Sequence, residues 1–387
     1  MLVWGLYLLL KGAIAGSLLF YAACIWFTWR FFQPVSSLPT LPTLPQPRPG
    51  VSVLVPVRGL EPAAWENWVS LCEQNYPTYE VLFGVVDVDD PAVPLLRQLE
   101  ATYPERVRLF VGLSPRGINQ KDSTLTYLLE VACHEVIVFV DSDIWVQPDY
   151  LHIVTTPLAN PEVGMVTCAF VGHAPRFVGA AIASLGRCCD FIPSALIARA
   201  LDGGLRFAVG ATIAMRRTVL EAAGGLHVSR IGSDYNLGKR TAAAGYRVEL
   251  SRYLLEADTG NESLGALLRR ELRWARTIRF NRGRIYYAQV LCFGTVLSLL
   301  LVLVTGFASW AIALLSLTLS VRYLQAAIAI YCMNCRGLWR WLWLLPLRDW
   351  LNVGVWFWGA VGDRVTWRGR RLRIYEDGLI KLDQAQP

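Results

Sequence analysis

Residues 135–143 read EVIVFVDSD, a short apolar run that ends abruptly in two aspartates. Three similar runs precede it, and segments that could form helices lie between them. The four apolar runs span residues 51–57, 79–87, 107–112 and 135–143. The intervening helical segments span residues 65–74, 93–103 and 122–132. Alternating strands and helices with continuously apolar strands predict an α/β fold with a mostly parallel, Rossmann-type sheet covered on both faces.

The composition points to a membrane. The chain has 387 residues, of which 54% are hydrophobic and 17% charged, and its formal net charge is +7. This composition excludes a disordered protein and is too apolar for an ordinary soluble enzyme. Positive charge on so apolar a chain suits an anionic membrane surface or an anionic substrate. We therefore expect a membrane protein that does not bind nucleic acid.

The N-terminal part of the chain predicts a membrane anchor. Residues 12–29 contain no charged side chain. As a helix they would span roughly 27 Å, close to the hydrocarbon thickness of about 30 Å. We expect a retained anchor within residues 1–33 rather than a cleaved signal peptide. The prolines that follow predict an extended linker over 34–50.

A second apolar region follows the polar middle of the chain, which we expect to form a separate domain over residues 51–284. Residues 285–321 carry no charge and are too long for one span. They predict two spans that turn near Gly306, the second reaching about Cys332.

Residues 338–360 form a third apolar stretch, with Arg348 and Asp349 at its middle. This central pair favours a broken helix or one lying in the membrane interface, so we place the C-terminal membrane helices within 285–360. The tail, 361–387, is basic, and the positive-inside tendency places it in the cytoplasm with the domain over residues 51–284.

Acidic residues gather where the predicted strands end. Asp141 and Asp143 follow the fourth run directly, and residues two apart in extended backbone point to the same side. Two carboxylates together with substrate phosphates are a usual site for Mg²⁺ or Mn²⁺. Residues 87–90 read DVDD and end the second run in the same way. The alternative for each segment is a solvated turn, but two acidic strand ends at one sheet edge favour a ligand site.

Two further motifs lie between the sheet and the second apolar region. Asp234 precedes a helical stretch, where it could either act in catalysis or cap the helix. Arg270, Arg273 and Trp274 would share one face of a helix, and the arginines could bind a diphosphate. The alternative is a juxtamembrane basic belt that contacts lipid headgroups, a role that we expect for Arg279, Arg282 and Arg284.

Taken in order, these motifs resemble the ceramide glucosyltransferase family, glycosyltransferase family 21, whose members are membrane-anchored inverting enzymes of the GT-A type. The matching segments are DVDDPA at 87–92, GINQK at 117–121, Asp141–Ser142, Asp234–Tyr235, and Arg270, Arg273 and Trp274. The resemblance runs from the anchor to about residue 285, and it implies a GT-A-like catalytic domain.

The resemblance also implies roles for individual residues. Asp234 would be the general base and Asp90 would bind the nucleotide. Asp141 and Asp143 would hold a divalent cation, and Lys121 would neutralise phosphate together with the two arginines. The remaining residues that we expect to contact substrate are Pro56, Arg58 and Trp274.

The resemblance implies a hexosyltransferase that uses a UDP-sugar, with UDP-glucose favoured, Mg²⁺ or Mn²⁺, and the hydroxyl of a ceramide-like membrane lipid. Residues 270–279, RELRWARTIR, are also similar to bacterial relatives that transfer N-acetylglucosamine to hopanoids, which leaves this reaction as an alternative. For either reaction we expect a multi-pass protein of a bacterial inner membrane. A processive polysaccharide synthase shares the acids but would need a pore through several helices.

Overall fold

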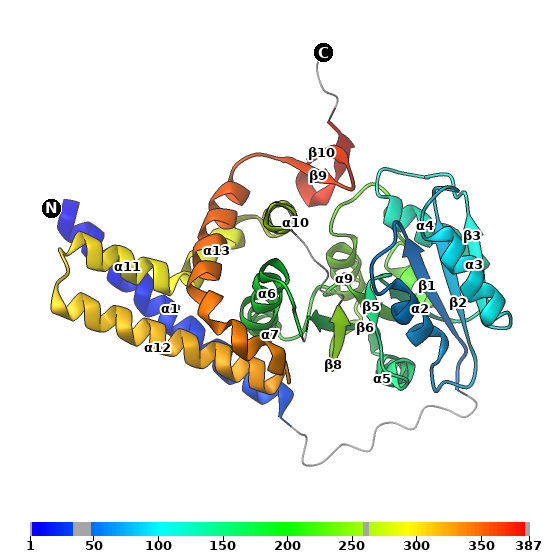
Figure 1. Ribbon diagram of the computed structural model, residues 1–387, viewed down its shortest axis with the longest axis horizontal. Helices are drawn as coiled ribbons and strands as arrows, with labels where there is room; N and C mark the ends of the chain where they lie inside the picture. Colours follow the sequence, from blue (N-terminus) through cyan, green and yellow to red (C-terminus); the bar gives the residue numbers. More distant parts are fainter. Residues whose placement is uncertain (1, 34–47, 173, 258–262, 384–387) are drawn as a thin grey trace.

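The computed structural model describes residues 2–33, 48–172, 174–257 and 263–383. Its centre is an eight-stranded sheet with the order β3-β2-β1-β4-β7-β6-β8-β5 (Figure 1). The strands are β1 (Val51–Val57), β2 (Tyr79–Val85), β3 (Val107–Val111), β4 (Val136–Val140), β5 (Ile144–Trp145), β6 (Val163–Val171), β7 (Thr212–Arg216) and β8 (Arg247–Ala257).

The predicted α/β core is confirmed. Strands β1 to β4 coincide with the four apolar runs and pair in parallel with one another. Every residue of β1 and β4 is buried, as expected for strands covered on both faces. The predicted helices form as α2 (Ala64–Cys72), α3 (Val93–Thr102) and α4 (Gln120–Val131). The second half of the sheet is mixed, because β7 lies antiparallel between β4 and β6.

The other helices of the catalytic part are α5 (Tyr150–Thr155), α8 (Arg217–Ala222), α9 (Ser233–Ala243) and α10 (Leu264–Arg282). Between β6 and β7 the chain runs through α6 (Val178–Leu185), a π-helical segment (Gly186–Phe191) and α7 (Ile192–Leu201). This segment is largely buried inside the protein although it is long and apolar enough to cross a membrane.

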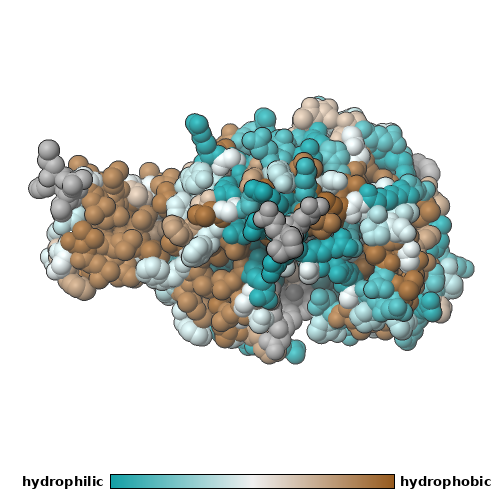
Figure 2. Space-filling view, turned by 90° about the horizontal axis from the view of Figure 1, so that it is seen from above, coloured by the Kyte–Doolittle hydropathy of each residue, from teal (hydrophilic) through white to brown (hydrophobic). Residues whose placement is uncertain are grey.

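Three helices form the membrane lobe: α1 (Leu2–Phe32), α11 (Gly294–Val304) and α12 (Ser309–Cys332). They pack against one another, and Figure 2 shows that apolar surface covers their lobe. The chain turns between α11 and α12 at Gly306 and Phe307, which both have positive φ angles, so the predicted turn is confirmed. Among the described residues, α1 and α12 are candidate spans on their own, whereas α11 becomes one only with the bent segment before it.

The third apolar stretch is broken, as predicted. A 3₁₀ segment, Arg336–Leu344, leads into α13 (Leu345–Ala360). Four of its tryptophans are strongly exposed, namely Trp339, Trp343, Trp350 and Trp358. The predicted proline-rich linker lies, for residues 34–47, outside the described residues.

Charged side chains form a buried network between α13, α12 and the catalytic part. Asp349 accepts from Arg322, with 2.7 Å between Oδ1 and Nη2. Arg348 pairs with Glu271 of α10 at 2.6 Å and with Asp190 of the π-helical segment at 3.2 Å. Arg348 and Asp349 therefore each take partners from distant segments, and the network fixes α10 against α13.

The C-terminal residues form a small sheet rather than a simple tail. Its strands are β9 (Arg364–Trp367), β10 (Arg370–Ile374) and β11 (Ile380–Leu382). The Ile231 amide donates to the Gly378 carbonyl at 2.8 Å, and the Ile380 amide donates to the Ser229 carbonyl at 2.9 Å. This sheet consequently lies on the catalytic domain, beside the N-terminus of α9.

Candidate active site

A lysine joins two of the predicted acids at the carboxyl edge of the sheet. Lys121 Nζ lies 2.6 Å from Asp141 Oδ1 and 3.5 Å from Asp234 Oδ1. Burial lowers the pKa of Lys121, but the two carboxylates outweigh burial and hold that pKa above its usual value. The ammonium group thus stays charged and brings α4, the end of β4 and the start of α9 together at one point.

Asp234 is the second residue of α9, and Gly232, the residue before this helix, has a left-handed conformation and provides no side-chain cap. A Cβ on Gly210 would lie 3.0 Å from Asp234 Oδ2, so a side chain at position 210 would crowd the carboxylate. Burial raises the pKa of Asp234, and Lys121 partly offsets that effect. A carboxylate with a raised pKa is a better proton acceptor near neutral pH.

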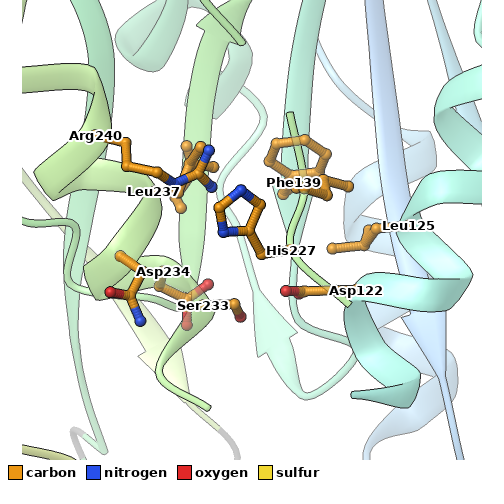
Figure 3. A pocket seen from close by; sticks show the side chains of 11 residues that line it. Asp122, Leu125, Phe139, His227, Ser233, Asp234, Leu237 and Arg240 are labelled. Carbon is orange, nitrogen blue, oxygen red and sulfur yellow. The ribbon is translucent and has the colours of Figure 1, made fainter. Parts of the chain in front are cut away.

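A small pocket beside Asp234 contains a second carboxyl group. Asp122, from α4, lines it together with Ser233 and His227 (Figure 3). The pocket has a volume of about 10 Å³, at the lower limit for one water molecule. The Asp122 side chain is 1% exposed, and its Oδ2 has no hydrogen-bond partner among the described residues. Burial and the neighbouring Asp234 raise the pKa of Asp122 to about 7.

Asp141 and Asp143 follow the end of β4, as predicted. Asp141 is half-buried and Asp143 is exposed. Although the Asp143 side chain reaches solvent, the surrounding protein reduces the hydration of its carboxylate. This effect and the Asp141 carboxylate raise the pKa of Asp143 to about 6. The described residues contain no group of three or more His, Cys, Asp or Glu side chains placed to hold a metal. Because Mg²⁺ is usually held by one or two carboxylates plus substrate phosphates, this pair suits a cation completed by the substrate.

The ends of β1 and β2 are tied together by Asp90. Its carboxylate accepts from the Gly59 amide at 2.8 Å and from the Ala92 amide at 2.9 Å, so it shapes the loop after β1. Arg58 emerges from that loop and donates to Gln120 Oε1 at 2.8 Å. Pro56 is a buried residue inside β1. Substrate contacts by these residues stay predictions.

Helix α10 presents the predicted basic face beside the acids. The Arg270 guanidinium carbon lies 5.4 Å from the Trp274 ring centre. Arg273 lies 5.6 Å from the ring of Trp367 in the C-terminal sheet. Burial, followed by repulsion from Arg270 and Arg368, lowers the pKa of Arg273 to about 10.

Arg368, at the turn between β9 and β10, was not predicted from the sequence. Its side chain is exposed, and its backbone has a φ of 49°. Reduced hydration lowers the pKa of Arg368, while the carboxylates of Asp141 and Asp143 oppose that shift. The guanidinium is therefore within electrostatic reach of both acids. The only signal in the sequence is the run WRGRRLR at 367–373, which does not identify its target.

Two arginines that we expected at lipid headgroups instead make contacts within the protein. Arg279 donates to the carbonyl groups of Ala360 and Gly362. Arg282 lies 4.8 Å from the Phe207 ring and 5.6 Å from the Tyr235 ring. The first therefore holds the end of α13, and the second packs beside the residue that follows Asp234.

This arrangement combines a proton acceptor with a strongly charged anion site. The Asp234 carboxylate, which Lys121 contacts, can accept a proton. Other charged residues surround the same edge. The predicted Arg58 and Asp90 lie on one side, and the predicted Arg270 and Arg273 lie on the other together with Arg368, which was not predicted. Such a site can bind a polyanion and stabilise charge on a departing group.

Comparisons with known proteins agree with this architecture. A sequence profile described as glycosyl transferase family 21 matches residues 9–380. Ceramide glucosyltransferase 3 of Caenorhabditis elegans is 26% identical over 59% of this chain and 50% of its own length. Ceramide glucosyltransferase 1 of the same organism is 24% identical over 70% of this chain and 57% of its own length. The chain thus spans about half the length of these curated relatives.

A solved structure shares the fold. The mannosyltransferase PcManGT from Pyrobaculum calidifontis, in complex with GDP-Man and Mn²⁺, aligns with a TM-score of 0.55 at 20% identity. The alignment covers 92% of this chain and 97% of that chain. The predicted GT-A-like fold is confirmed by this likeness together with the observed sheet.

Proposed function

The chain belongs to glycosyl transferase family 21, and from that membership we propose that it transfers one hexose from a nucleotide sugar to the hydroxyl group of a membrane lipid. The favoured donor is UDP-glucose and the favoured acceptor is ceramide-like. The observation that supports this proposal is the contact of Lys121 with both Asp141 and Asp234, because the carboxylate that we propose as the proton acceptor thereby lies near an acid expected to face the diphosphate.

The proposed reaction is a single displacement. The acceptor oxygen attacks the anomeric carbon while Asp234 removes its proton, and the bond to the diphosphate breaks on the opposite side. This geometry inverts the anomeric configuration and requires no enzyme nucleophile. Lys121 keeps Asp234 oriented and charged until the proton is transferred.

The diphosphate needs positive charge as it leaves. Arg270, Arg273 and Arg368 supply it from the α10 side, and Arg58 supplies it from the β1 loop. Asp141 and Asp143 would hold Mg²⁺ or Mn²⁺, which would stabilise the leaving diphosphate as a Lewis acid. The solved neighbour was captured with Mn²⁺ and a nucleotide sugar, which supports the choice of these groups.

We further propose that the protein lies in the membrane as a multi-pass protein, with its catalytic domain in the cytoplasm of a bacterium. The C-terminal sheet and the catalytic domain touch, so they occupy one side. An accessibility experiment with single cysteines at exposed positions of the catalytic domain in intact cells would test which side that is.

The activity test pairs purified protein with UDP-glucose, UDP-N-acetylglucosamine or GDP-mannose, and with ceramide or a hopanoid polyol. Mass spectrometry would identify the lipid product and NMR its anomer. We expect a β-linked monohexosyl lipid that requires Mg²⁺ or Mn²⁺. A product with the hopanoid alone would select that acceptor, and a polymer would contradict single transfer.

Asp234→Asn provides the mechanistic control. Loss of the general base is expected to reduce turnover by about 10²–10⁴-fold without changing the melting temperature by more than a few degrees. Asp149→Asn changes an exposed carboxylate and should retain activity. Equal rates in the two variants would refute the role of Asp234.

A further inference from the structure

A second pocket lies outside the acidic site, between α10 and the C-terminal sheet. Its volume is about 240 Å³, below the roughly 300–1,000 Å³ typical of drug-sized ligands. Five arginines line it, with Asp383 as the single acidic lining residue: Arg269, Arg273 and Arg276 from α10, and Arg364 and Arg371 from the sheet. The pocket is therefore small and strongly positive.

The positive charge of these arginines is only partly neutralised by nearby carboxylates. Asp383 contacts Arg364 at 3.4 Å, which leaves a net charge of four among the lining side chains. Arg276 Nε is buried and has no hydrogen-bond partner among the residues that the structure describes. Like charges around one cavity repel one another unless an anion is bound. Guanidinium groups bind phosphate oxygens, like carboxylate oxygens, through two parallel hydrogen bonds.

The pocket adjoins the part of the protein suited to the membrane interface. Figure 1 shows α10 between α13 and the strands β9 and β10. Arg276 Nη2 donates to the Trp358 carbonyl at 3.4 Å. Trp358 is 62% exposed, and the adjacent Phe357 is 56% exposed. Exposed tryptophans on an apolar helix are typical of headgroup depth, where phospholipid phosphates are found.

We propose that this pocket, which shares Arg273 with the neighbouring acidic site, binds the phosphate of an anionic phospholipid rather than the sugar donor. The lipid would bridge α10 and the C-terminal sheet, and its acyl chains would lie along the exposed aromatic residues of α13. Binding would hold both elements that contribute arginines to the neighbouring site. This inference concerns a lipid that is bound but not glycosylated, so it does not depend on the proposed reaction.

The experiment uses the full chain in a neutral detergent, without donor or acceptor. Short-chain phosphatidylglycerol is titrated while the melting temperature is followed, and phosphatidylcholine with the same chains is the neutral comparison. We expect saturable stabilisation by phosphatidylglycerol alone. Inorganic phosphate is titrated separately, because equal stabilisation by phosphate at the same concentration would assign the pocket to a free anion and overturn the lipid proposal.

The variant Arg269→Gln/Arg371→Gln removes one exposed arginine from each wall, and neither residue belongs to the acidic site. Its affinity for phosphatidylglycerol should fall at least tenfold, while its melting temperature without lipid stays near that of the parent. The matched control, Arg97→Gln/Arg247→Gln, also loses two exposed arginines and should bind as the parent does. Equal affinities in the two variants, or equal binding of phosphatidylcholine, would overturn the proposal.

Discussion

The folded protein disfavours the charged form of the Asp122 carboxyl group. Its pKa is raised to about 7 by burial and by Asp234. The folded state therefore binds a proton that the unfolded state has released between about pH 4 and 7. The stability contributed by this protonated group is present at low pH and is lost as the pH rises through 7.

Asp122→Asn removes that titration. We expect the variant to gain more stability at pH 8 than at pH 5, with a difference of roughly 1–3 kcal/mol. Thermal unfolding in detergent at both pH values measures it. Asp149→Asn, at an exposed site, should respond equally at the two pH values, and the same behaviour in Asp122→Asn would rule out a buried titrating carboxyl group.

Arg368 offers a second test at the scale of one side chain. Since it is exposed and near Asp141 and Asp143, Arg368→Gln should weaken donor binding. We expect kcat/KM for the nucleotide sugar to fall about tenfold, near 1.4 kcal/mol, mainly through KM. Arg370→Gln removes an exposed arginine two positions away and should leave KM unchanged. Equal effects of both substitutions would indicate a general loss of positive charge.

At the scale of elements, α10 depends on α13 for its position. Arg348 is 7% exposed, and its two acidic partners belong to α10 and to the π-helical segment. A Cβ on Gly186 would overlap the Arg348 guanidinium, so the π-helical segment approaches it closely. Arg270 precedes the Glu271 that Arg348 binds, which links this network to the basic face of the active site.

Arg348→Met leaves Glu271 without its cation, while Asp190 keeps its pair with Arg322 at 2.7 Å. Breaking a buried pair by removing one partner costs about 3–5 kcal/mol, so the melting temperature and the turnover should both fall. Arg348→Met/Glu271→Leu also removes the unpaired carboxylate and should recover part of the stability. Arg336→Met, at an exposed position, is the control. No recovery in the double variant would mean that Glu271 is not the main partner.

Elements built from neighbouring residues were predictable. The apolar runs at 51–57 and 107–112 gave β1 and β3 within one residue, because burial on both faces imposes an unbroken apolar pattern. Strands β6, β7 and β8 were not predicted. Strand β7 pairs antiparallel with β4, and β6 pairs in parallel with β8. In both pairs a long stretch of chain separates the two strands, so no local pattern predicts the pairing.

At the scale of the whole molecule, the C-terminal sheet docks through a small apolar cluster. Ile374, Leu372 and Ile380 are each 1% exposed and pack with Ile231. Ile374→Asp would place a charge in this cluster and detach the sheet. We expect faster tryptic cleavage at the arginines of β10 and a donor KM raised as in Arg368→Gln. Thr366→Asp, at an exposed position of β9, should change neither.

In the candidate site, too, residues that belong to local motifs could be predicted, whereas residues brought in by distant contacts could not. Lys121, Asp141 and Asp234 could be picked out because each belongs to a local motif that resembles the family. Arg368 could not, since its position depends on the docking of a sheet that follows the membrane helices. The partners of Arg322 are likewise 132 and 27 positions away, and no local pattern predicts such contacts.

The hydrogen bonds between Ser229–Ile231 and Gly378–Ile380 also constrain the order of assembly. The ribosome makes the strand-end acids early, then the hairpin of α11 and α12, and residues 364–382 after these. The hairpin must enter the bilayer in the orientation that returns the chain to the side of the catalytic domain before those bonds can form. The candidate site is therefore incomplete in a nascent or misinserted chain, and we expect the proposed activity to arise only after correct membrane insertion.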